Sequence, residues 1–242
     1  MSDWVYGFFM AWGMFLAIPC PKKIWRESAR RKMLACLPLV GCIVGGVWVL
    51  CACLVQWLPG PLAAALLAAA PWLATGFLHL DGFMDVCDAV MSRRDLETRR
   101  RILKDSHCGA FAVICMVLLA MGQWSAFLSA RSLPLWGLAL IPVASRSCAS
   151  LAVLTLRPLG SSQYSEMARG GGPVWFAAAC LAASVVLPLV LAGSFGPLAA
   201  AVGYGLAVWY GFRQLDGMSG DISGFALTVG ELWGVLALAI GR

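Results

Sequence analysis

The sequence predicts an all-α, polytopic integral membrane protein with a single domain over residues 1–242 and six to eight transmembrane helices. Two observations carry this prediction. Of the 242 residues, 61% are hydrophobic and only 12% are charged, whereas a soluble domain carries about 25% charged residues. The apolar residues also gather in runs, several of them near the roughly 20 residues that a helix needs to cross a bilayer. No stretch has the polar surface of a separate soluble domain.

Eight apolar runs follow one another along the chain. They cover residues 4–19, 33–58, 60–80, 109–130, 133–156, 173–193, 196–212 and 225–241. The first and last runs are short enough to be interfacial or re-entrant instead of spanning, hence the range of six to eight. The first run has neither a basic n-region nor a small-residue cleavage site, so we expect a retained membrane segment and not a signal peptide. Within the second run, Gly41 and Gly45 form a small-residue pattern typical of close helix packing.

Basic residues concentrate in two loops. Residues 21–32 and residues 93–104 each carry six basic side chains, together two-thirds of all Lys and Arg in the chain. By the positive-inside rule both loops face the cytoplasm. Alternating the remaining spans puts the other polar segments, 79–108, 157–172 and 213–224, on that same side. We therefore expect the protein to act at its cytoplasmic face.

Three aspartates follow the uncharged run that ends near residue 78, in the stretch "HLDGFMDVCDAV". Asp81, Asp85 and Asp88 stand at i, i+4 and i+7, so a helix puts all three on one face. Like charges at this spacing repel, and each charge would cost about 2.5–3.5 kcal/mol at the membrane centre. Something must therefore compensate them.

The cluster has three interpretations from residues alone. It is a solvated helix end, the ion relay of a transporter, or a Mg²⁺ site that holds a phosphate-bearing substrate. Mg²⁺ is usually bound by a few carboxylates together with substrate phosphates. The basic segment 93–104 follows directly, and its guanidinium groups can clamp phosphates in pairs of hydrogen bonds. An acidic cluster followed by a basic one favours the metal–diphosphate interpretation, although lipid binding by the arginines stays open.

The same residues resemble a known family. The stretch "ATGFLHLDGFMDVCDAV…RRRILKDSHCGAF" is similar to the signature of the cobalamin synthases, the adenosylcobinamide-GDP ribazoletransferases. "FLAIPCP", "PLVGCIVGG" and "GMSGDISGFALTVGE" resemble further family segments in the same order, so the likeness runs from end to end. Three positions depart from the family pattern: Ile18 follows Ala17 where Thr-Arg is usual, Ala89 replaces a glycine, and His107 replaces an arginine.

The resemblance implies an enzyme of the last steps of cobalamin biosynthesis. Such an enzyme joins adenosylcobinamide-GDP to α-ribazole or its 5′-phosphate and releases GMP, with Mg²⁺ as cofactor. It would lie in the bacterial inner membrane as a multi-pass protein with its active site toward the cytoplasm. Its partners would be these small molecules and the lipid bilayer, without nucleic acid. A homo-oligomer or a complex with other cobalamin-assembly enzymes is left open.

The resemblance and the charge pattern together assign the candidate site residues. Asp81, Asp85 and Asp88 are expected to hold Mg²⁺, with Asp85 or Asp88 as the base, and Lys104 is a further catalytic candidate that contacts phosphate. The remaining candidates are substrate contacts: His79, Arg99, Arg100, Asp105, Arg146, Arg157, Arg169 and Asp221. Arg146 lies inside an apolar run and needs a partner, for which the aspartates or a substrate phosphate are expected. Glu231, in the last run, is either a site residue or paired with a neighbour.

Two other functions remain as alternatives. A transporter could use the aspartates as an ion relay, but it would have no use for the arginine cluster. A phosphatidyltransferase-like lipid enzyme would carry the pattern Asp-x-x-Asp-Gly-x-x-Ala-Arg. Here the spacing is Asp-x-x-x-Asp-x-x-Asp and the Ala-Arg pair is missing, which argues against it.

Overall fold

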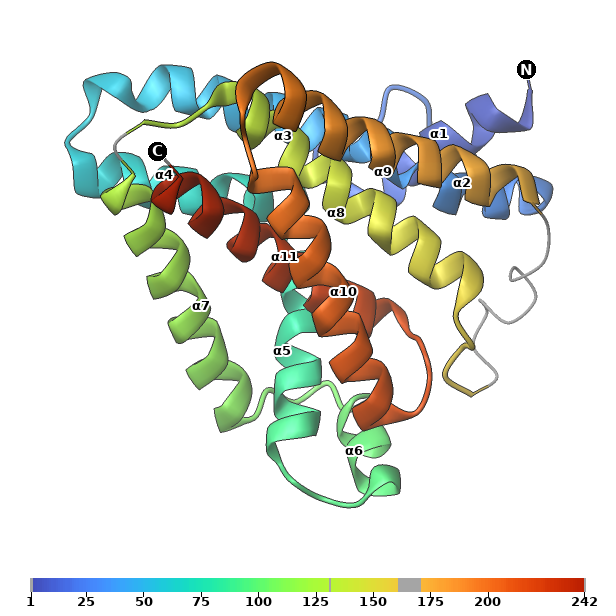
Figure 1. Cartoon of the computed structure of the whole chain (residues 1–242). Coiled ribbons are helices and arrows are strands. Elements are labelled where there is room, and N and C mark those ends of the chain that lie inside the picture. Colours follow the sequence, from blue (N-terminus) through green and yellow to red (C-terminus); the bar gives the residue numbers. More distant parts are fainter. Residues whose placement is uncertain (1, 131, 161–170, 242) are drawn as a thin grey trace.

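The computed structural model describes residues 2–130, 132–160 and 171–241, and within these ranges it is built from helices without a strand (Figure 1). Two short 3₁₀ helices, Glu27–Ala29 and Val55–Trp57, join longer elements. The α-helices are α1 (Asp3–Phe15), α2 (Arg30–Ala35), α3 (Leu37–Leu54), α4 (Gly60–Ala74), α5 (Leu78–Met91), α6 (Leu96–Ile102), α7 (Ala110–Ser129), α8 (Leu135–Thr155), α9 (Gly171–Ala192), α10 (Gly196–Leu215) and α11 (Gly220–Ile240).

The predicted all-α, multi-pass architecture is confirmed. Among the described residues, five helices are long and apolar enough to cross a membrane, and the bent pair of α4 and α5 makes a sixth candidate. Six is the lower end of the predicted range. The 13-residue α1 spans only about 20 Å at 1.5 Å per residue, too short for a bilayer core of about 30 Å. Helix α10 has the length, but its glycines, tyrosines and Arg213 keep it out of this set.

The run 60–80, which we predicted as one span, is broken in two. Gly76 and Phe77 both have positive φ, at 59° and 63°, a left-handed conformation that ends a helix. Helix α4 therefore stops at Ala74, and α5 leaves it at an angle of 94°. The turn is held by the Phe77 N–H, which donates to the Trp72 carbonyl at 2.8 Å. This bend turns the aspartates of α5 away from the direction of α4.

Helix α8 is the central element. Among the helices long and apolar enough to cross a membrane, it has the largest share of buried residues, 67% over its most apolar 18 residues. Helix α3 packs directly on it through the predicted small-residue pair. A Cβ atom on Gly41 would lie 2.5 Å from the Pro142 carbonyl oxygen, and one on Gly45 would lie 2.0 Å from that of Ala139. Any side chain at either position would therefore force the two helices apart. Helices α7 and α9, by contrast, are mostly exposed, as expected of lipid-facing spans.

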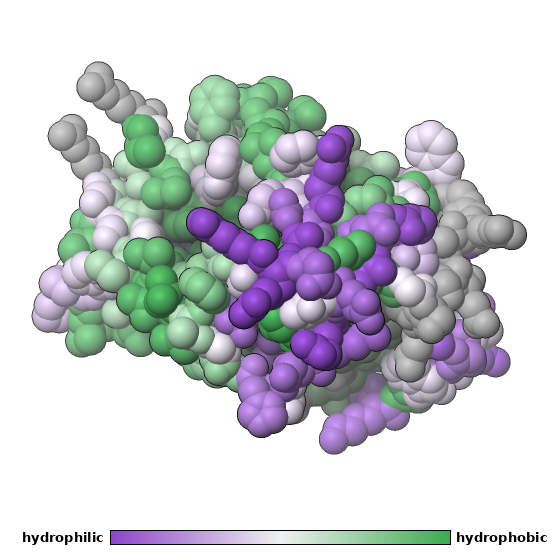
Figure 2. Space-filling view, turned by 90° about the horizontal axis from the view of Figure 1, so that it is seen from below, coloured by the Kyte–Doolittle hydropathy of each residue, from purple (hydrophilic) through white to green (hydrophobic). Residues whose placement is uncertain are grey.

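The polar segments meet at one end of the molecule. Figure 2 views the molecule from the end at which α6 lies, and the hydrophilic side chains gather there. Leu159 donates its N–H to Met218 at 2.8 Å, and Met218 donates to Arg157 at 2.8 Å. The chain after α8 is thus joined to the chain between α10 and α11. This agrees with the prediction that segments 157–172 and 213–224 share one side, as far as their described residues go.

Candidate active site

Helix α5 presents its three aspartates to one small cavity, as their spacing predicts. Asp81, Asp85 and Asp88 line a volume of about 70 Å³. The opposite wall is formed by Ile102 of α6 and by residues 106–109, which lead into α7. Asp81 is exposed, and the other two aspartates are half-buried. The acidic face is therefore accessible and not sealed inside the protein.

A fourth carboxylate joins this face from α11. Asp221 stands in the first turn of α11, where the Ser219 side chain accepts a hydrogen bond from the Ile222 N–H at 3.2 Å. Its backbone touches α5 so closely that a Cβ atom on Gly82 would lie 2.9 Å from the Asp221 Cα. Asp221 and Asp81 repel each other electrostatically. The structure thus brings the predicted acidic contact of "SGDISG" to the aspartates of α5.

These four carboxylates lack a cationic partner in the described part of the chain, where no Lys or Arg nitrogen lies within 4.0 Å of any of them. The described part of the chain also contains no set of three His, Cys, Asp or Glu side chains arranged to hold a metal ion by themselves. The donors are all oxygen atoms, which Mg²⁺ prefers, and Mg²⁺ is commonly completed by water and substrate phosphates. The donor set therefore fits a Mg²⁺ shared with a substrate, and not a closed protein cage.

Three of the predicted substrate arginines contact the end of α10 or the residue that follows it. Arg99 hydrogen-bonds to the Gln214 side chain. Arg100 pairs with the Asp216 carboxylate at 3.1 Å, and Arg157 pairs with the same carboxylate. Arg100 also donates to backbone carbonyls at the end of α10, where cations complement the helix dipole. These contacts fix the corner before α11, and substrate binding by the three arginines stays a prediction.

The segment after α6 forms one wall of the aspartate cavity. Lys104 and Asp105 are both exposed. His107 lies where the family resemblance leads us to expect arginine; its N–H donates to Asp105 at 3.0 Å and its Nδ1 lies 2.6 Å from the same oxygen. These hydrogen bonds from His107 lower the pKa of the Asp105 carboxyl. Farther along, Gly109 lies directly against the Asp88 carboxylate.

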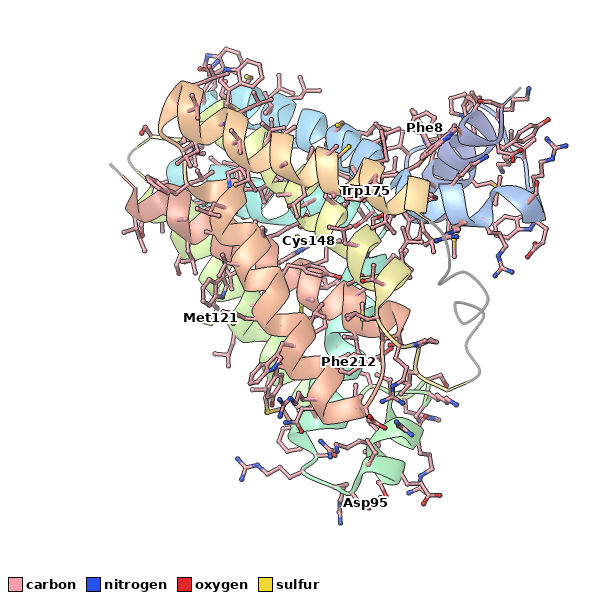
Figure 3. The ribbon with its side chains drawn as sticks, turned by 45° about the vertical axis from the view of Figure 1, so that its right-hand side comes forward. Phe8, Asp95, Met121, Cys148, Trp175 and Phe212 are labelled. Atoms are coloured by element: carbon pink, nitrogen blue, oxygen red, sulfur yellow. The ribbon has the colours of Figure 1, made fainter. Side chains whose placement is uncertain are left out.

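Arg146 has a different partner from the one we expected. It is buried in α8 and forms an ion pair of 2.5 Å with Glu231 of α11, not with the aspartates of α5. Ser145 also donates to Glu231, at 3.3 Å. Both side chains of the pair are buried. Figure 3 shows Cys148 of the same helix within the bundle, whereas Asp95 lies at the polar end. A buried charge requires such a partner, and Glu231 supplies it.

A second cavity, of about 200 Å³, lies behind the aspartates. Its polar lining is His79, Asp81, Arg146, Asp221 and Ser223. Its apolar lining includes Phe15, Leu34, Leu37, Ala149, Val153 and Leu227. Because Asp81 lines both cavities, it stands at their junction. The structure therefore brings together four of the predicted site residues, His79, Asp81, Arg146 and Asp221.

Other parts of the chain contribute less. A further cavity, of about 730 Å³, lies between α1 and the loop after it, and none of the predicted site residues lines it. Arg169 falls outside the described residues.

The sequence left the role of Glu231 open. The signal was a lone carboxylate within an apolar run, but the sequence does not show that its partner is Arg146.

Comparison with known proteins gives one consistent result. The family model described as cobalamin-5-phosphate synthase matches residues 7–239. A protein of Clostridium botulinum (strain Alaska E43 / Type E3) named adenosylcobinamide-GDP ribazoletransferase is 36% identical over 253 residues, covering 99% of each chain. Proteins with the same name are 36% identical in Clostridium perfringens (strain 13 / Type A), over 96% of each chain, and 34% identical in Halalkalibacterium halodurans, over 98% of this chain and 97% of the relative. No solved structure matches this chain.

Proposed function

Because this chain belongs to the cobalamin-5-phosphate synthase family, we propose how its aspartates carry out the family's reaction. The protein is a transferase of the final steps of cobalamin biosynthesis. It joins adenosylcobinamide-GDP to ribazole, and GMP is the other product. The family match sets aside the transporter and the phosphatidyltransferase-like enzyme as alternatives.

The reaction is a substitution at phosphorus. A ribose hydroxyl of the acceptor attacks the phosphorus on the cobinamide side of the diphosphate, and a new O–P bond forms. The bond from that phosphorus to the bridging oxygen breaks, and GMP leaves with this oxygen. The hydroxyl proton goes to a carboxylate of the site. Asp85 and Asp88 are suited to this role because both are half-buried on the cavity and hydroxyl activation needs a base within hydrogen-bonding reach.

The unpaired carboxylates support a role for Mg²⁺. Asp81, Asp85 and Asp88, with Asp221 beside them, would hold the ion together with the diphosphate. When bound, Mg²⁺ would neutralise charge on the phosphate oxygens, which is the main requirement of phosphoryl transfer. The protein's own contribution is to orient both substrates and to accept the proton. Lys104 and Asp105 remain candidates for phosphate contact from the end of α6.

We further propose that the site faces the cytoplasm. The two strongly basic loops favour an orientation with the polar end in the cytoplasm, where nucleotide substrates are made. The membrane would then be the bacterial inner membrane, since that is the bilayer in contact with the cytoplasm. Within the bilayer, the apolar faces of α7 and α9 would contact lipid.

One observation carries the mechanism: four carboxylates from two helices converge beside accessible cavities, and no cation within the described residues balances them. The test is GMP release by the purified protein in liposomes with adenosylcobinamide-GDP, α-ribazole phosphate and Mg²⁺. Asp85→Asn should abolish release. Asp95→Asn is the matched control, because Asp95 caps α6 outside the cluster and asparagine caps equally well. Equal activity of the two variants would refute the aspartate site.

A further inference from the structure

The lining of the 200 Å³ cavity combines two chemically distinct kinds of side chain. Aliphatic side chains, among them Leu34, Leu37 and Val153, form what we call its aliphatic wall. The polar part of the lining includes Arg146 and His79. Pockets for drug-sized ligands measure about 300–1,000 Å³, so this cavity is suited to a single fused ring system. Neither a corrinoid nor a whole nucleotide would fit.

Arg146 offers hydrogen bonds to this cavity but little net charge. Its Nη1 is committed to Glu231, and the side chain is only 1% exposed. Its Nε and Nη2 are buried and find no hydrogen-bond partner among the described residues. Buried donors without partners are costly, and Arg146 is a lining residue of this cavity, so its two unpaired donors suggest an acceptor supplied by a ligand. The ion pair with Glu231 holds the guanidinium in place to meet it.

His79 provides a second unsatisfied nitrogen at the same cavity. Its Nε2 is buried and has no partner within the described ranges. Its ring stacks against Phe15 with the ring centres 6.3 Å apart and the planes 14° from parallel. The backbone at His79 is fixed as well, because its carbonyl accepts from the Thr228 hydroxyl at 3.3 Å. The cavity thus combines an ordered aromatic pair, aliphatic side chains and three unused polar nitrogen atoms.

We propose that this cavity binds the aromatic base of the ribazole acceptor, with Arg146 and His79 recognising the unsubstituted ring nitrogen of that base. This proposal rests on the proposed function and assigns one half of its acceptor. The base lies against the aliphatic wall, and its ribosyl group reaches past Asp81. Since Asp81 lines both cavities, the attacking hydroxyl is then directed toward Asp85 and Asp88.

Two competing occupants fit the cavity less well. A phosphate group would meet two carboxylates, Asp81 and Asp221, against a single guanidinium. The charge of that guanidinium, on Arg146, is already balanced by Glu231, and like charges repel. A guanine base carries polar atoms on most of its edge, which the aliphatic wall would leave without partners. The base of α-ribazole is a benzimidazole, which carries methyl or hydrogen substituents on its six-membered ring and a single free acceptor nitrogen. Its ring matches the aliphatic wall, and its nitrogen matches the polar part of the lining.

The first test enlarges the cavity. Val153→Ala removes two methyl groups from its wall, and Val143→Ala is the matched control, a buried valine of the same helix that does not line the cavity. The measurement is equilibrium binding, to protein in detergent, of α-ribazole and of an analogue with one further fused ring. We expect Val153→Ala to shift the affinity ratio toward the larger analogue about tenfold, the scale of hydrophobic size discrimination. Val143→Ala should leave the ratio at its wild-type value.

The second test removes the donors. Arg146→Lys keeps a cation opposite Glu231 but loses Nε and Nη2. Wild-type protein should bind an indole riboside, which lacks the acceptor nitrogen, at least tenfold more weakly than α-ribazole, and Arg146→Lys should narrow this gap. Absence of ribazole binding, or the same affinity ratio in Val153→Ala and Val143→Ala, overturns the assignment of the cavity.

GMP release measured on the same preparations separates this proposal from the proposed function. A shifted binding ratio without GMP release supports the base cavity and counts against the mechanism. GMP release with Mg²⁺ but no shift in the ratio supports the mechanism and refutes the base cavity.

Discussion

Arg146 and Glu231, two fully buried side chains, form an ion pair that joins α8 to α11 across the centre of the protein. Arg146 also lines the cavity that Asp81 and Asp221 line. It therefore links the packing of two central helices to the shape of the site. Both the stability of the protein and its activity should depend on this contact.

Breaking this pair should cost more than replacing it. Glu231→Ala leaves Arg146 as an uncompensated buried charge, and such a change typically costs about 3–5 kcal/mol of folding free energy. The double variant Arg146→Met/Glu231→Leu restores apolar packing and should recover most of that stability, but not activity. Thermal unfolding in detergent measures the first effect and GMP release the second. A single variant as stable as the wild type would show that water or another group reaches Arg146.

Mg²⁺ should stabilise the folded protein through the aspartate cluster. A ligand that binds only the folded state adds about 2.7 kcal/mol at 100 times its Kd. Wild-type protein should therefore melt at a higher temperature with Mg²⁺ than with EDTA. In EDTA, Asp85→Asn should melt above wild type, because it removes one of several mutually repelling carboxylates, and Mg²⁺ should stabilise it less. If Mg²⁺ raises the melting temperature of both proteins equally, the ion binds elsewhere.

Local periodicity made part of this structure predictable. The spacing of Asp81, Asp85 and Asp88 defines one helical face whatever surrounds it, and α5 presents that face to a cavity. The small residues Gly41 and Gly45 predicted a close helix contact, and α8 fills it. These features need only the geometry of one helix. The same holds for the all-α membrane architecture, which follows from composition and run length.

Features that depend on tertiary contacts could not be predicted. The bend after α4 uses Phe77 at positive φ, which is unusual for a bulky residue and leaves no mark in a uniformly apolar run. Arg146 and Glu231 are 85 positions apart in sequence, so their pairing depends on how α8 packs on α11. The arginines of α6 had the composition of a phosphate clamp, but two of them, Arg99 and Arg100, contact the end of α10.

Asp216 provides a test of those arginines. Its φ is 56°, a conformation that asparagine also tolerates, so Asp216→Asn removes the charge without altering the turn. Because the pairs with Arg100 and Arg157 are exposed, each should contribute only about 0.2–1 kcal/mol, and the loss should shrink at high salt. Arg157→Gln breaks only one of these two pairs, so its loss of ion-pair stability, as measured by thermal unfolding, should be smaller than that of Asp216→Asn.

Substrate binding by Arg157 would appear in the kinetics instead. If Arg157 also contacts a phosphate, Arg157→Gln should raise the KM for adenosylcobinamide-GDP about tenfold, since a hydrogen bond to a charged group contributes about 1.5–3 kcal/mol. Asp216→Asn should leave that KM nearly unchanged, because Arg157 remains in place. Matching KM values for the two variants would assign Arg157 to the corner before α11 alone.

The contact between α5 and α11 should control activity through backbone distance. A Cβ atom on Gly82 would lie 2.9 Å from the Asp221 Cα and carbonyl oxygen, so Gly82→Ala must push the two helices apart and move Asp221 relative to Asp81. Overpacking of this kind costs about 1–3 kcal/mol, and GMP release should fall more than the loss of folded protein explains. Gly46→Ala is the control, because a Cβ atom there meets nothing within 4 Å and alanine favours the helix. Thermal unfolding and GMP release should be measured on both variants. Full activity in folded Gly82→Ala would mean that Asp221 does not act together with the aspartates of α5.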